Sequence, residues 1–212
     1  MLETTFETSR ERVSVCEVSP DSIPATHNTH VFAVCVTSDG VPVVGVRRTS
    51  FAYQSVILRR KQASVVPVDR ALLPYMYVNE LKDIYSRLLR AGQLRAPDSA
   101  RFEELVLLGG CLHKQESVHE CLAREIGEES DAKLTVRGFG ARALKITIFD
   151  KLLAKQYTGY CTLCFVAERL AEVQHATLYN FEVRRLCSLH DKKENEKYQY
   201  LSFIYNTLIP TK

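Results

Sequence analysis

The chain has 212 residues, 46% of them apolar, and a formal net charge of +3. This composition predicts a folded domain with a sizeable core and excludes a disordered tail, while the small net charge does not by itself indicate nucleic-acid binding. We expect no signal peptide and no membrane span, and the seven cysteines show no disulfide-framework spacing, which favours a reducing compartment.

In chain order, apolar and alternating runs predict strands at 29–36 and 41–46, joined by a turn at 38–40. Another strand is expected at 104–108. It leads into Gly109 and Gly110, where glycine allows the backbone to approach a phosphate or a metal closely. Further strands are expected at 144–149, 157–166 and 181–186. Strands on both sides of a central helix indicate a mixed α/β sandwich.

An insertion of about 55–101 separates the first two strands from the central motif. Within it, apolar residues from Tyr77 to Leu88 recur at helical spacing, and Gly92 can end that helix. A second amphipathic helix is expected near the C-terminus, over 201–208. Because no linker composition interrupts the chain, we expect residues 1–212 to form a single domain.

The central helix begins at a capping box, with Ser117 as the cap and Glu120 three residues later. Its apolar stripe is formed by Val118, Cys121, Leu122 and Ile126. With Val118 at 0° and a step of about 100° per residue, Glu125 falls at about 340° and Glu129 at about 20°, both inside the stripe. Glu128 falls at about 280°, on the border of the stripe, and Glu120 and Arg124 point away.

A solvated, charged helix end is the ordinary interpretation of such a glutamate cluster. Here the acids would lie on the apolar side and would oppose the helix dipole, two costs that favour a functional site. Carboxylates on a buried side require a cationic partner, and carboxylate oxygens suit Mg²⁺ or Mn²⁺ better than zinc. The Cys161-x-x-Cys164 pair lies in an apolar strand, so we predict buried thiols there.

The segment from Gly110 to Asp131 resembles the Nudix box. The matching positions are Gly110, Glu116, Arg124, Glu125, Ile126, Glu128 and Glu129. Asp131 stands where the box ends in glycine, and aspartate tolerates a left-handed backbone better than most residues. With THVFAVCVTSDGVPVVGVRRTSFAYQ and LKITIFDKLLAKQY, the chain from about Phe6 to Tyr205 resembles the poxviral mRNA-decapping Nudix enzymes, specifically the smaller, early-expressed type.

The resemblance implies a Nudix fold, a mixed-sheet α/β/α sandwich with a helical insertion and a C-terminal helix. It also implies a metal site. The expected metal ligands are Glu125, Glu129, Glu182 and the backbone carbonyl of Gly110, and the expected catalytic residues are Glu125, Glu128 and Glu129. Glu116 and Arg124 are expected to pair and brace the loop against the helix. By sequence alone, Glu182 could equally be a solvent-facing residue of a half-buried strand.

The same resemblance implies recognition of a methylated guanine, whose positive charge favours stacking between aromatic rings. Phe51 and Tyr157 are the expected rings, and Glu11 and Asp150 are the expected acceptors for the guanine edge. No spacing rule joins these four residues. Taken alone, Phe51 and Tyr157 could be packing residues, Asp150 a turn residue, and Glu11 a surface partner of the neighbouring arginines.

The implied reaction is metal-dependent hydrolysis of the mRNA cap, giving 7-methyl-GDP and RNA with a 5′ monophosphate. The implied setting is the host-cell cytoplasm, with capped viral and host mRNA as the partner, no DNA, no membrane, and a monomeric protein. Basic pairs such as Arg47-Arg48 and Arg184-Arg185 then suggest a track for the RNA body. Two alternatives are a Nudix enzyme acting on free nucleotides or nucleoside diphosphate derivatives, and a non-catalytic cap- or RNA-binding module.

Overall fold

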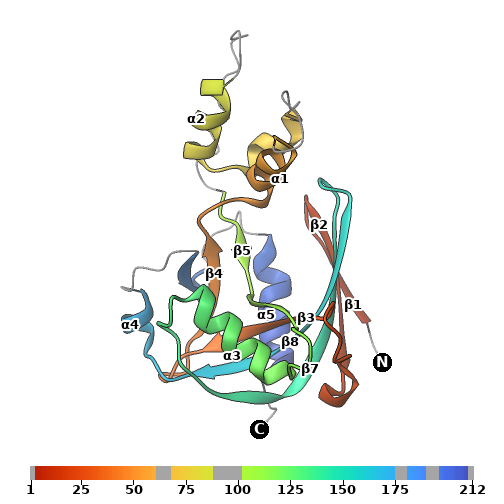
Figure 1. Ribbon diagram of the computed structural model, residues 1–212, viewed down its shortest axis with the longest axis vertical. Coiled ribbons are helices and arrows are strands. Elements are labelled where there is room, and N and C mark those ends of the chain that lie inside the picture. Colours follow the sequence, from red (N-terminus) through yellow and green to blue (C-terminus); the bar gives the residue numbers. More distant parts are fainter. Residues whose placement is uncertain (1–2, 61–67, 88–101, 175–180, 190–195, 210–212) are drawn as a thin grey trace. The chain divides into compact units, whose positions relative to one another are not determined.

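The computed structural model describes residues 3–60, 68–87, 102–174, 181–189 and 196–209 (Figure 1). The chain divides into two compact units, the first formed by 1–46 with 105–212 and the second by 47–104. The first unit contains a mixed sheet with helices, which confirms the predicted α/β class. Among the described residues, none of the helices combines the length and apolar character needed to cross a membrane.

A nine-stranded sheet organises the first unit. Its main path runs in the order β1 (Glu3–Glu7), β2 (Glu11–Val18), β7 (Val136–Asp150), β8 (Lys155–Val166), β3 (His30–Val36), β4 (Pro42–Arg47) and β5 (Leu105–Val106). Two strands lie off this path: β6 (Leu108–Cys111) pairs with β3, and β9 (Phe181–Arg185) pairs with β4. Strand β3 runs parallel to β8 and antiparallel to β6. The sheet is therefore mixed around β3.

Two helices cover opposite faces of this sheet. Successive residues of β3 point to opposite faces, so Val34 packs in one apolar cluster and Ala33 in another. Helix α5 (Lys197–Leu208) contributes Ile204 to the cluster around Val34, whereas α3 (Val118–Glu129) contributes Leu122 to the cluster around Ala33. Figure 1 shows the two helices on the two sides of the sheet. The helix predicted at the C-terminus is thus present as α5.

The second unit is helical, with α1 (Phe51–Arg60), the 3-10 helix η2 (Arg70–Tyr75) and α2 (Val78–Arg87). Helix α2 is the helix that the spacing after Tyr77 predicts, and the stop expected at Gly92 lies outside the described residues. Helix α1 was not predicted. Ser50 caps it, because the Ser50 hydroxyl accepts a hydrogen bond from the Tyr53 N–H at 3.0 Å.

The strand predicted at 104–108 is instead two short strands, β5 and β6, which pair with different partners, β4 and β3. Gly109 lies in β6 with φ +140°, and a Cβ there would lie 2.2 Å from the carbonyl oxygen of Val31. Only glycine fits this approach. The short elements not yet named are η1 (Pro20–Ser22), α4 (Leu170–Gln174) and η3 (Leu186–Leu189).

Candidate active site

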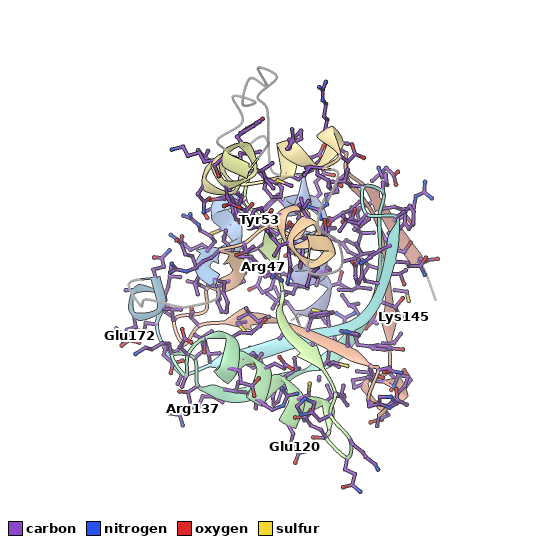
Figure 2. All side chains as sticks on the ribbon, turned by 45° about the horizontal axis from the view of Figure 1, so that its top comes forward. Arg47, Tyr53, Glu120, Arg137, Lys145 and Glu172 are labelled. Carbon is purple, nitrogen blue, oxygen red and sulfur yellow. The ribbon has the colours of Figure 1, made fainter. Side chains whose placement is uncertain are left out.

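Helix α3 starts with the predicted capping box. Ser117 accepts a hydrogen bond from the Glu120 backbone N–H at 3.2 Å, and the Glu120 carboxylate accepts one from the Ser117 N–H at 2.8 Å. Glu120 lies on the exposed side of the helix (Figure 2). This cap fixes the first turn, so the rotational positions of the glutamates at the other end of the helix follow from the helical repeat.

The three glutamates at the end of α3 differ in exposure as their angular positions predict. The Glu125 side chain is 18% exposed, whereas that of Glu128 is 63% exposed. Glu129 is half-buried, and its Oε2 accepts a hydrogen bond from the Gly109 N–H at 3.0 Å. Glu125 and Glu129 therefore turn toward the sheet, and Glu128 lies at the border with solvent.

The backbone of Gly110 and the Glu125 carboxylate are immediate neighbours. A Cβ added to Gly110 would lie 2.3 Å from the Glu125 Cδ and 2.4 Å and 2.5 Å from its oxygens. Within the described ranges, no group of three or more His, Cys, Asp or Glu side chains is gathered at metal-binding distance. The Glu125 carboxylate lies beside Gly110, and the Glu129 carboxylate is held at the neighbouring Gly109. Such oxygen ligands fit a hard divalent cation.

Arg124 links the loop before α3 to the helix. Its guanidinium contacts both oxygens of Glu116, at 2.8 Å and 3.0 Å, and donates to the Cys111 carbonyl at 3.2 Å. It also contacts Glu125 at 2.7 Å, a pairing that the sequence did not reveal. The hydrogen bonds from Arg124 lower the pKa of Glu116 from its ordinary value of 4.5 to about 2. Glu116 therefore stays ionised and the loop stays attached at neutral pH.

The backbone after α3 is left-handed at Asp131, with φ +50°. This is the position where the Nudix box has glycine, and the conformation is the one that aspartate was expected to tolerate. Ala132 follows with φ +57°, and its N–H returns to the Gly127 carbonyl at 2.8 Å. The end of the box therefore keeps the chain reversal that glycine would provide, with two non-glycine residues in the left-handed region.

Glu182, the fourth residue of the expected metal set, is the second residue of β9. Its side chain is 57% exposed and lies 3.6 Å from the Arg184 guanidinium. The alternation of β9 places Phe181 and Val183 in the core and Glu182 on the other face. Its contribution to a metal site stays a prediction.

Glu11 and Asp150 are directly paired across β2 and β7, and both are buried, with 6% and 4% exposure. Oδ1 of Asp150 accepts the N–H groups of Leu152 and Leu153, both at 2.9 Å, so Asp150 does close a turn. Its Oδ2 pairs with the buried Arg10 at 2.8 Å. The structure thus brings together the two acids that the resemblance assigns to one recognition site.

Glu11 is not a surface partner of the neighbouring arginines. Its Oε2 accepts a hydrogen bond from the Tyr200 hydroxyl at 3.0 Å, and its Oε1 lies 3.1 Å from the Lys197 ammonium. Arg12 instead pairs with Glu7 at 3.1 Å on the exposed side. Lys197 and Tyr200 were not predicted from sequence, since they come from the start of α5, far along the chain.

The two expected stacking residues lie in different units. Tyr157 belongs to β8 in the first unit and is 50% exposed, so it is not a core residue. Burial raises the pKa of its hydroxyl, and the charge of nearby Asp150 raises it further. Phe51 begins α1 in the second unit, where the Arg47 guanidinium lies 4.3 Å from the centre of its ring. The joint role of the two rings stays a prediction.

The cysteine pair of β8 consists of buried thiols, as predicted. Cys161 and Cys164 are both in the core, and burial raises the pKa of Cys161 to about 12. Cys35 lies opposite Cys164 on the parallel strand β3. Hydrogen bonding with Cys164, together with burial, raises the pKa of the Cys35 thiol. All three thiols are buried, and the raised pKa values of Cys161 and Cys35 keep those two protonated, which argues against a nucleophilic or zinc-binding role.

No family model matches the chain. It is, however, 47% identical over 210 residues to the mRNA-decapping protein OPG121 of vaccinia virus (strain Western Reserve), covering 99% of this chain and 97% of the relative. The mRNA-decapping protein D9 of rabbit fibroma virus is 47% identical over 210 residues, covering 99% and 100%. The putative Nudix hydrolase FPV054 of fowlpox virus (strain NVSL) is 46% identical over 209 residues, covering 98% and 89%. The chain therefore belongs to this poxviral family of mRNA-decapping Nudix hydrolases.

Proposed function

We propose that the protein hydrolyses one pyrophosphate bond in the triphosphate bridge of the 7-methylguanosine cap of mRNA, giving 7-methyl-GDP and RNA with a 5′ monophosphate. The observation that carries the proposal is the position of the Glu125 and Glu129 carboxylates against the backbone of Gly110 and Gly109. It occurs in a chain that matches poxviral decapping proteins over 99% of its length. Similarity of fold alone would not identify a reaction, whereas the acidic residues of the Nudix box indicate metal-dependent hydrolysis.

We also propose a Nudix fold for residues 1–212 as a single domain, with the insertion at about 55–101 and the C-terminal helix α5 as additions. The support for this arrangement is the order of β6, the loop with Glu116, and α3 within the first unit. Arg124 joins that loop to the helix by its two contacts with Glu116. A strand, a braced loop and a capped helix hold catalytic acids more precisely than a free loop does.

The metal set proposed for this chain is Glu125, Glu129 and the Gly110 carbonyl, with Glu182 as a further ligand. Nudix hydrolases generally use divalent cations, and oxygen donors favour Mg²⁺ or Mn²⁺. A cation held there would neutralise charge on the pyrophosphate and lower the pKa of the attacking water.

Glu128 is our candidate for the general base, with Glu125 and Glu129 as the alternatives. Its side chain is 63% exposed, and its Arg124 contact is a long one of 3.4 Å. The carboxylate can therefore reach a water molecule without breaking a strong ion pair. Water is the nucleophile, so no covalent intermediate forms on the protein.

For recognition, we propose that Tyr157 stacks on the methylated guanine and that Glu11 and Asp150 accept hydrogen bonds from its edge. Half of the Tyr157 side chain is exposed, which leaves its ring surface available. The two acids are paired across neighbouring strands and can act on one base. Phe51 is proposed as the second aromatic ring on the strength of the family resemblance. We place the reaction in the host-cell cytoplasm, on capped viral and host mRNA, by a monomer that binds neither DNA nor membranes.

The test uses RNA that carries ³²P in the cap phosphates, incubated with the protein and Mg²⁺ or Mn²⁺. We expect labelled 7-methyl-GDP from the wild-type protein and none from Glu125→Gln or Glu129→Gln. Glu120→Gln is the matched control on the same helix, because glutamine preserves the capping box. Circular dichroism should show the same fold for all four proteins. Retained turnover in both Glu125→Gln and Glu129→Gln would refute the metal assignment.

The same assay separates the alternatives. Faster hydrolysis of free nucleoside triphosphates or cap dinucleotide than of capped RNA would favour a nucleotide pyrophosphatase. Tight binding of capped RNA without metal-stimulated cleavage would favour a non-catalytic binding module. That second alternative must also explain why Glu125 and Glu129 remain on the sheet side of α3.

A further inference from the structure

Three buried charged side chains, Arg10, Glu11 and Asp150, lie with the mostly buried Lys197 where β2, the β7–β8 turn and α5 meet. The Arg10–Asp150 pair has side chains 5% and 6% exposed, and the Lys197–Glu11 pair has side chains 14% and 8% exposed. Since Glu11 and Asp150 are partners across β2 and β7, the two ion pairs are adjacent. We call these four residues the buried charge cluster.

Stability alone does not account for such a cluster. Removing two ion pairs from water costs about as much as their attraction returns, and well-packed apolar residues would stabilise the fold at least as well. The neighbouring inward positions of β2 are Val13 and Val15, which show that this face accepts apolar side chains. Charges retained at such positions indicate that their geometry serves another purpose.

The start of α5 holds the Glu11 carboxylate from two sides. Lys197 and Tyr200 are three residues apart, so they lie on one face of the helix. Lys197 contacts Oε1 at 3.1 Å, and the Tyr200 hydroxyl donates to Oε2 at 3.0 Å. Lys197 also donates to the Leu105 carbonyl at 3.3 Å, which anchors the ammonium to the sheet. Both oxygens of Glu11 are therefore fixed, and with them the plane of the carboxylate.

Glu11 and Asp150 differ in how many hydrogen-bond acceptor positions their carboxylates still have available for a ligand. A carboxylate offers about two acceptor positions on each oxygen. Asp150 has two N–H donors on Oδ1 and the Arg10 Nε and Nη2 atoms on Oδ2. Glu11 has one side-chain donor on each oxygen among the described residues. One further position on each oxygen of Glu11 suits the N1–H and one N2–H of a guanine Watson–Crick edge. The second N2–H can bind Asp150 only by replacing one of the donors that Asp150 already holds.

We propose that Lys197 and Tyr200 are positioning residues that hold Glu11 for bidentate recognition of the guanine edge of the cap. The proposal rests on the proposed function and adds to it the C-terminal helix as a determinant of base specificity. Lys197 and Tyr200 act through Glu11 and do not touch the reacting phosphates. Their loss should therefore weaken discrimination among bases and leave the chemical step intact.

The experiment measures binding of 7-methyl-GDP and of 7-methylinosine diphosphate, which lacks the N2 amino group, by isothermal titration calorimetry. For Tyr200→Phe and Lys197→Met, we expect the Kd for 7-methyl-GDP to rise about tenfold, the size of one lost hydrogen bond to a charged group. The preference over the inosine ligand should shrink by a similar factor. KM for capped RNA should rise while kcat changes by less than about twofold.

Two further variants separate positioning from folding. Tyr205→Phe removes a hydroxyl from the same helix five residues beyond Tyr200 and should bind like the wild-type protein. Lys197→Arg keeps the positive charge and should recover most of the base preference. Tyr200→Phe is the decisive variant should Lys197→Met fold poorly, because it removes one oxygen atom only.

If Tyr200→Phe keeps the wild-type Kd values and base preference, the positioning proposal is overturned. Cleavage of capped RNA by the wild-type protein would still support the proposed function in that case. A fall in kcat at unchanged Kd would also overturn it, because that pattern indicates a structural role. A wild-type protein that neither binds 7-methyl-GDP nor cleaves capped RNA would overturn the proposed function, and this inference with it.

Discussion

Replacing Gly110 with alanine displaces a carboxylate without changing a single acid of the box. The new Cβ would stand 2.3 Å from the Glu125 Cδ and 2.4 Å from the nearer oxygen. A normal contact needs roughly 3.4 Å or more, so the carboxylate must move by about 1 Å. Gly110 has no positive φ, and the displaced atoms are the end of a long side chain. The fold should therefore accept the substitution with less than about 1 kcal/mol of lost stability.

The catalytic effect should be much larger than the effect on stability. A misplacement of about 1 Å in a catalytic group costs on the order of 100-fold in rate. We therefore expect kcat of Gly110→Ala on capped RNA to fall about 100-fold, equivalent to about 2.7 kcal/mol in the barrier. KM for capped RNA should stay within about threefold, since the residues proposed to read the base come from other strands.

The assay is single-turnover cleavage of cap-labelled RNA, with thermal unfolding measured in parallel. Gly127→Ala is the matched control, because it lies in the same box on α3 and a Cβ there meets nothing within 4 Å. It should retain wild-type turnover and unfold at the same or a slightly higher temperature. The reasoning is refuted if Gly110→Ala turns over at the wild-type rate, or if Gly127→Ala loses as much activity as Gly110→Ala.

Three further predictions concern stability. Gly109→Ala should destabilise the protein by more than about 3 kcal/mol in urea unfolding, since φ is +140° and the Cβ would overlap the Val31 carbonyl; a loss below about 1 kcal/mol would contradict the β6–β3 approach. Because the pKa of Glu116 is lowered, its ionised carboxylate contributes its full stabilisation above about pH 4.5 and loses it as the pH falls through about 2. The difference in melting temperature between wild type and Glu116→Gln should therefore vanish in acid. A difference that does not change with pH would contradict this role of the Glu116 carboxylate. Asp131→Val should lose about 1–2 kcal/mol in thermal unfolding because φ is +50°, whereas Asp131→Gly should be tolerated; equal stability of the two would exclude strain there.

Local periodicity accounts for the parts of the fold that the sequence predicted. Strand β3 and helix α3 are visible because their apolar residues repeat at the spacing of their own element. Strands β1 and β2 were missed, since their alternation includes glutamate and arginine at positions that local pattern assigns to solvent. Strand β1 is an edge strand with half-buried inward residues, so its apolar signal is weak.

The candidate site likewise has one part that local sequence predicts and one part that it does not. The helical repeat alone predicts that Glu125 and Glu129 turn toward the sheet, and the structure has them there. The partners of Glu11 could not be predicted, because they lie 186 and 189 residues further along the chain. A partial signal was available: Glu11 shares the period-2 parity of Val13 and Val15, which marks it as an inward acid that needs a cation.

The placement of the two sets of acids argues that cleavage and recognition can be perturbed separately. Glu125 and Glu129 depend on β6, which is paired with β3 in the sheet, and on α3, which packs on one face of the sheet. Glu11 depends on α5, which packs on the opposite face. A side chain changed on one face reaches the other only through strands held in fixed register by their hydrogen bonds. Gly110→Ala should therefore act on kcat and Tyr200→Phe on KM, and the free-energy effects of the two in one protein should add.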